Sequence, residues 1–112
     1  MPIKTKDIKD ITIITADVDW ATIIVADSFK NSVQFEIAAN KRKFIFNLSS
    51  CEFIDSTFLS AIITSYKRIV ENGGNLAIVG LKPAVKAMFQ LTRLDEILEI
   101  HTNEKEGLSS LA

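Results

Sequence analysis

Asp55-Ser56-Thr57 combines a carboxylate with two hydroxyls, residue types that can form hydrogen bonds or accept a phosphoryl group. All three side chains can accept hydrogen bonds from the free N–H groups at a helix start, a cap that contributes about 1 kcal/mol. A hydroxyl at a helix start can also accept a phosphoryl group, because the free N–H groups favour negative charge there. The residues alone favour a helix cap and leave a phosphorylation site open.

Cys51, Ser56 and His101 could supply the nucleophile and the base of a small hydrolase. A serine nucleophile usually lies in a glycine-flanked turn, and no glycine flanks Ser56. Cys51 lies in an apolar segment, as buried structural cysteines commonly do. Hydrolysis is therefore a disfavoured alternative, and we assign no catalytic residue.

The composition argues against several other kinds of site. One cysteine, one histidine and four glycines exclude a disulfide framework, a Cys/His metal cluster and a glycine-rich phosphate loop, so no metal or cofactor is expected. The net charge of -1 gives no long-range attraction to nucleic acid. Lys41-Arg42-Lys43 is better explained as a solvated helix end than as a nucleic-acid patch. Two carboxylate pairs fall in predicted turns, where solvated residues are common: Asp17 with Asp19, and Asp95 with Glu96.

The 112 residues have the length and hydrophobic content of one folded domain. We find no apolar signal core at the N-terminus and no hydrophobic run long enough for direct membrane insertion. A lone thiol favours a reducing, cytoplasmic location. If Met1 is the natural start, we expect a stand-alone module.

The hydrophobic pattern predicts alternating strands and helices after an N-terminal hairpin. The hairpin would pair residues 8–15 with residues 20–25, and Asp27-Ser28 would begin a helix that ends near Asn40. The later predicted elements are a buried strand over 44–48, a connection over 49–54, a helix from 55–57 to 72–74, a strand over 75–80, a helix from Pro83, a strand over 97–100 and a marginal helix within 103–112.

This order predicts an α/β fold. The sheet should be small, mixed and mostly parallel, with the N-terminal hairpin at its start and helices packed mainly on one face. We assign residues 1–112 to one domain with a core of about 8–101. A phosphoacceptor receiver domain, suggested by Asp55 and Lys82-Pro83, is disfavoured, because too few elements separate these residues.

Three segments together resemble the STAS domain family of bacterial anti-sigma factor antagonists. Residues 44–57 resemble its buried strand followed by a hydrophobic residue and D-S-[ST] at a helix start. Residues 72–80 resemble its next loop and strand, and residues 91–97 resemble its L-T-x-L-D segment. The resemblance covers roughly residues 11–111, and it implies a STAS-like fold.

The resemblance implies a protein-binding module and not an enzyme. Its expected partner is an anti-sigma factor that is also a serine protein kinase, and a PP2C-type phosphatase is a further expected partner. Carried over by position, Ser56 is the phosphorylation site, Thr57 is its neighbour and Asp55 is the flanking acid. The expected partner-binding residues are Asp55, Ser56, Thr57, Phe58 and Ser60.

Phe58 and Ser60 depart from the family pattern, which usually has glycine at both positions. Glycines there would permit close approach of a partner backbone. Phe58 could be a binding anchor or an extra core contact. These departures keep a second function open, a constitutive STAS adaptor in a signalling scaffold or a transporter-accessory subunit, without phosphorylation.

Overall fold

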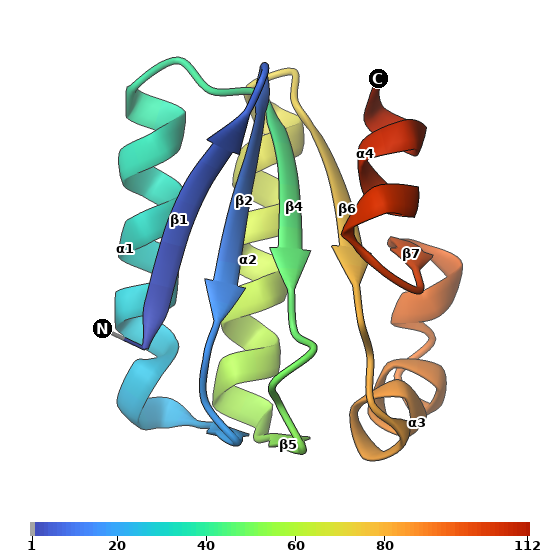
Figure 1. Ribbon diagram of the computed structural model, residues 1–112. Coiled ribbons are helices and arrows are strands. Elements are labelled where there is room, and N and C mark those ends of the chain that lie inside the picture. The colour runs from blue at the N-terminus through green and yellow to red at the C-terminus, as the bar shows by residue number, and fades with distance from the viewer. Residues whose placement is uncertain (1) are drawn as a thin grey trace.

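The central sheet contains five strands in the order β1-β2-β4-β6-β7 (Figure 1). These are β1 (Ile3–Ile8), β2 (Ile11–Ala16), β4 (Lys43–Asn47), β6 (Asn75–Val79) and β7 (Glu99–His101). β1 is antiparallel to β2, and all other neighbouring strands are parallel, which confirms the predicted sheet. β3 (Trp20–Ala21) and β5 (Phe53–Ile54) form a separate parallel ribbon. The computed structural model describes residues 2–112.

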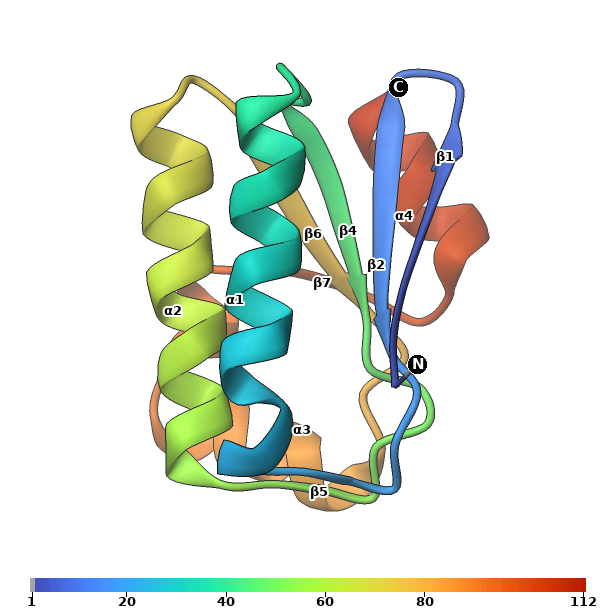
Figure 2. The ribbon, with the colours of Figure 1, turned by 90° about the vertical axis from the view of Figure 1, so that its left-hand side faces the viewer.

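The helices cover both faces of this sheet. They are α1 (Ile23–Ala38), α2 (Ser56–Glu71), α3 (Pro83–Leu91) and α4 (Glu104–Leu111), with a short 3-10 helix over Leu94–Glu96. α1 and α2 lie side by side on one face, and α4 lies on the other (Figure 2). No helix within residues 2–112 is long and apolar enough to cross a membrane.

Two apolar clusters fill the space between these layers. The larger one joins the sheet to α1, α2 and α3, and its largest members are Phe29, Phe44, Phe46, Phe58 and Phe89. The smaller one joins the sheet to α4 and contains Ile11, Ile13, Ile45, Ala77, Val79 and Leu111. β4 and β6 contribute to both clusters, which is why their sequences are almost continuously apolar.

An N-terminal hairpin is present as predicted, but the predicted pairing is wrong. Residues 11–15 of the first predicted strand do form a strand, β2, whereas only Trp20–Ala21 of the second predicted strand is extended. The hairpin joins β1 to β2, and residues 23–25 belong to α1. The sequence pattern does not identify β1, because it is an edge strand whose middle residues are polar and exposed. α1 begins early because Thr22 caps it: the Ile24 N–H donates to Thr22 Oγ1 at 3.3 Å. The predicted start, Asp27-Ser28, lies inside the helix.

The elements after Asn40 lie close to their predicted positions. β4, α2, β6 and α3 form where the pattern places them, and Pro83 occupies the first turn of α3. Ile3 and Leu111 are both buried, so the packed region extends beyond the expected core of 8–101.

Candidate functional site

Asp55 caps the start of α2, and the same carboxylate also reaches α1. Asp55 Oδ1 accepts a hydrogen bond from the Phe58 N–H at 2.7 Å. Asp55 Oδ2 accepts a second one from the Ile23 N–H at 2.9 Å, and Ile23 is the first residue of α1. One side chain therefore satisfies free N–H groups of two helices, and only the first of these bonds is predictable from the sequence.

The β3–β5 ribbon holds the two helix starts side by side. Trp20 pairs with Phe53, Ala21 pairs with Ile54, and the Asp55 N–H donates to the Ala21 carbonyl at 3.0 Å. Each helix begins within two residues of its ribbon strand, so both N-termini lie at the same end of the molecule (Figure 2). The ribbon thus joins residues 20–24 to residues 53–57, which are distant in the sequence.

Three of the expected site residues present their side chains to solvent. Ser56, Thr57 and Ser60 are exposed, and Asp55 is half-buried. Ser56 and Ser60 are four residues apart on α2, so their side chains lie on one face of the helix. A second protein can therefore reach the Ser56 hydroxyl directly.

Phe58 does not belong to this surface, although we expected it among the partner-binding residues. Its side chain is 0% exposed, and its ring centroid lies 5.0 Å from that of Phe29 on α1. The ring that stands in place of a family glycine is therefore a core contact between α2 and α1. It anchors the first turn of α2 and cannot meet a partner without unpacking.

Four exposed apolar side chains surround the helix starts, and the sequence pattern does not indicate that they share a surface. The exposed fractions are 65% for Trp20, 66% for Ile23, 86% for Ile24 and 50% for Phe53. The rings of Trp20 and Phe53 are 5.1 Å apart between centroids. We call these four residues the aromatic–isoleucine patch. Once α1 is known to begin at Ile23, both isoleucines fall outside its buried stripe, which is the signal that could have found them.

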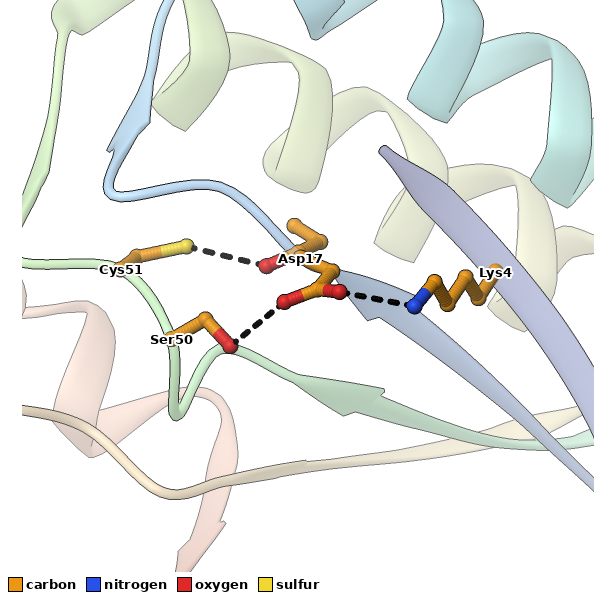
Figure 3. Close-up of polar contacts among 5 residues, drawn as sticks. Lys4, Asp17, Ser50 and Cys51 are labelled. Carbon is orange, nitrogen blue, oxygen red and sulfur yellow. Dashed lines mark hydrogen bonds and ion pairs between the residues drawn. The ribbon is translucent and has the colours of Figure 1, made fainter. Parts of the chain in front are cut away.

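Polar contacts fix the loops that flank the ribbon (Figure 3). Asp17 Oδ2 lies 2.8 Å from Lys4 Nζ, and the Ser50 hydroxyl donates to Asp17 Oδ1 at 3.1 Å. The hydrogen bond from Lys4 lowers the pKa of Asp17. This carboxylate, which the sequence places in a turn, thus ties the loop after β2 to the loop after β4.

The structure does not assemble the hydrolase alternative. Cys51 is buried and its thiol donates to the Ala16 carbonyl at 3.4 Å (Figure 3). Burial raises the pKa of Cys51 to about 11, so the thiol stays protonated and is a poor nucleophile near neutral pH. His101 is at the end of β7, with Nε2 3.3 Å from Glu99 Oε1, and β6 lies between β7 and β4. Neither Cys51 nor Ser56 is paired with this histidine.

The basic trio is engaged within the fold. Lys41 Nζ lies 2.8 Å from Asp7 Oδ2, and Lys43 Nζ lies 3.1 Å from Asp10 Oδ2. Arg42 donates through Nη1 to the Ile37 carbonyl at 3.1 Å, near the C-terminus of α1. α1 ends at Ala38 and Lys43 begins β4, so only Arg42 contacts the helix end. The predicted solvated helix end is therefore wrong for the two lysines, which pair with Asp7 and Asp10. Among residues 2–112, no group of three or more His, Cys, Asp or Glu side chains could hold a metal ion.

The family follows from comparison with known proteins. The model of the STAS domain matches residues 3–107. The chain belongs to the STAS domain family. An anti-sigma F factor antagonist from Paenibacillus polymyxa is 29% identical to this STAS domain over 82 residues, which are 70% of each chain.

Solved structures of similar proteins match the fold of this STAS domain over almost its whole length. The crystal structure of a proposed anti-sigma factor antagonist from Thermotoga maritima has a TM-score of 0.89 and 29% identity, covering 97% of this chain and 93% of that one. The Bacillus cell fate determinant SpoIIAA in its phosphorylated form has a TM-score of 0.77 at 12% identity, covering 98% and 99%. The protein is thus an STAS domain of the kind found in anti-sigma factor antagonists.

Proposed function

We propose that this STAS domain binds an anti-sigma factor that is also a serine protein kinase, through the surface at the start of α2. The observation that carries the proposal is the exposed Ser56 hydroxyl on the first residue of α2, close to the aromatic–isoleucine patch. The relative from Paenibacillus polymyxa, an anti-sigma F factor antagonist, supports the same class of partner. Such a partner acts in the cytoplasm, and the domain itself needs no catalytic residue.

Ser56 is the switch in this proposal. The kinase transfers the γ-phosphoryl group of ATP, so that a bond forms between Ser56 Oγ and phosphorus while the bond to the β–γ bridging oxygen breaks. ADP leaves, and the hydroxyl proton passes to a base on the kinase. A PP2C-type phosphatase restores the free hydroxyl by transferring the phosphoryl group to water, which releases inorganic phosphate.

The contacts of Asp55 explain how a phosphoryl group would release the partner. The group adds about two negative charges beside Asp55. The N–H groups of Phe58 and Ile23 are already bound to that carboxylate, so they do not compensate the new charge. A partner that covers the patch would have to strip water from the phosphate, which is costly. The unmodified form therefore binds, and the phosphorylated form dissociates.

Intact-mass spectrometry tests the switch directly. Incubation with an anti-sigma serine kinase and ATP should add one phosphoryl group to the wild type and none to Ser56→Ala. Thr57→Ala and Ser60→Ala are matched controls, because both residues are exposed within one turn of Ser56, and both variants should still be modified. A wild type that gains no mass, or a Ser56→Ala variant that does, would refute the proposal.

The position of Ser60 favours a second candidate, a constitutive STAS adaptor in a signalling scaffold or a transporter-accessory subunit. Its side chain stands beside Ser56 on the exposed face of α2, where a glycine would leave a kinase more room. In this case the same surface binds its partner without modification. Equal partner affinity for Ser56→Asp and the wild type would support the adaptor, and a clear loss of affinity would exclude it.

A further inference from the structure

The aromatic–isoleucine patch concentrates exposed apolar side chains at one end of the molecule. Eight large apolar side chains are exposed among residues 2–112, and four of them form this patch. The ribbon and the Asp55 bridge hold the four on fixed backbone, because Trp20 pairs with Phe53 and Ile23 is bonded to Asp55. A tryptophan in such a fixed, exposed cluster is typical of residues that dominate binding energy in protein interfaces.

Carboxylates border this patch. Four lie within a few residues of its members along the chain: Asp19, Asp27, Glu52 and Asp55. Lys82 Nζ lies 3.0 Å from Glu52 Oε1 and balances that charge. Asp27 is 3.5 Å from Lys30. Asp19 is exposed and forms no ion pair with any residue in 2–112, so the border carries net negative charge.

This charge distinguishes between the possible occupants. Two copies that met patch to patch would bring like-charged borders together, which disfavours self-association. An anionic lipid surface would be repelled for the same reason. A protein surface with an apolar centre and basic residues around it is complementary to the patch in hydrophobicity and to its border in charge.

We propose that the aromatic–isoleucine patch is the docking surface for a partner segment that carries an apolar face bordered by lysine or arginine. This inference rests on the proposed function for the location of the partner. It adds the chemistry of the partner segment that binds there. Trp20, Ile24 and Phe53 bury their side chains against the apolar face. Asp19, which forms no ion pair within residues 2–112, meets the basic residues at its border.

Trp20 provides a direct readout, because it is the only tryptophan of the chain. The probes are two tryptophan-free amphipathic helical peptides that share one leucine face and carry either lysine or glutamate on the polar face. The lysine peptide should shift Trp20 emission to shorter wavelength and bind at least about tenfold more tightly than the glutamate peptide. Raising the salt concentration should reduce this difference.

Substitutions within and outside the patch complete the test. Ile24→Ser and Phe53→Ser should each weaken binding of the lysine peptide about tenfold. Phe35→Ser is the matched control, since Phe35 is 71% exposed on α1 and lies outside the patch, and this variant should bind as the wild type does.

Three other results would overturn the proposal: no binding or equal binding of the two peptides, concentration-dependent dimerisation through the patch, or a Trp20 shift with anionic vesicles. The titration contains no kinase, so its failure is distinguishable from failure of the Ser56 switch.

Discussion

Asp55 is the residue on which the geometry of the candidate site depends most. Its two oxygens bind the N–H groups of Phe58 and Ile23, so removing the carboxylate leaves one free donor in each helix. We predict that Asp55→Ala lowers the free energy of unfolding by about 2 kcal/mol, about 1 kcal/mol for each lost cap. Asp55→Asn should lose about half as much, because an amide has one acceptor oxygen. Urea denaturation followed by circular dichroism measures both.

Asn103 supplies a matched control for this prediction. It caps α4 with a single bond, from the Glu106 N–H to Asn103 Oδ1 at 3.0 Å. Asn103→Ala should therefore cost about 1 kcal/mol. If Asp55→Ala costs no more than Asn103→Ala, the bond to α1 contributes nothing to stability and the bridging role assigned to Asp55 is wrong.

At this scale the sequence could predict the cap and the candidate phosphorylation site, but not the bridge. Asp55-Ser56-Thr57 is a local pattern, and both interpretations follow from it. The bond to Ile23 joins residues that are distant in the chain, and no local pattern reports it. Phe58 shows the same limit, because whether its ring reaches the core depends on the position of Phe29.

Among the elements, α4 is the one whose packing on the sheet depends on a single glycine. A Cβ on Gly107 would lie 2.9 Å from Val79 Cγ1 and 3.1 Å from Ile45 Cδ1. Alanine would gain about 1 kcal/mol in helix propensity, yet either α4 or the facing side chains of Val79 and Ile45 would have to shift, and such overpacking costs roughly 1–3 kcal/mol. We predict that Gly107→Ala lowers the free energy of unfolding by about 1 kcal/mol.

A second substitution separates crowding from propensity. Val79→Ala removes the methyl group that the new Cβ of Gly107→Ala would meet. Val79→Ala should therefore lower the free energy of unfolding less in the Gly107→Ala background than in the wild type. Urea denaturation of the four proteins gives this coupling. Additive costs, or a Gly107→Ala variant more stable than the wild type, would show that α4 has room to accept a Cβ.

The elements also show why some parts of the fold can be predicted from the sequence and others cannot. β4 and β6 are continuously apolar because both of their faces are covered, and α2 has a clear stripe between a cap and a glycine pair, so these were predicted. β1 has polar middle residues because it is an edge strand, and the β-branched residues at the start of α1 look like strand. In both cases the tertiary position outweighs the local preference.

For the whole molecule, these contacts imply that a negative charge placed on Ser56 would change the surface and leave the fold intact. Ser56 is exposed, and its neighbours are held by the Asp55 bridge, the ribbon and the buried Phe58 ring. Because Ser56 is exposed, a negative charge at this position is solvated and displaces no packed side chain. We predict that Ser56→Glu unfolds within about 0.5 kcal/mol of the wild type, as exposed substitutions usually do.

Backbone amide NMR spectra extend this prediction from stability to structure. Shift changes in Ser56→Glu should be confined to the starts of α1 and α2 and to the β3–β5 ribbon, because these segments alone share the Asp55 contacts. Thr57→Glu is the control for charge, since it adds the same group one residue away on an exposed position. Shift changes in β7 or α4 that occur in Ser56→Glu but not in Thr57→Glu would indicate that the charge at Ser56 alters the packing of the core. The switch would then act through the fold, and partner release would no longer need the phosphate to lie within the contact surface.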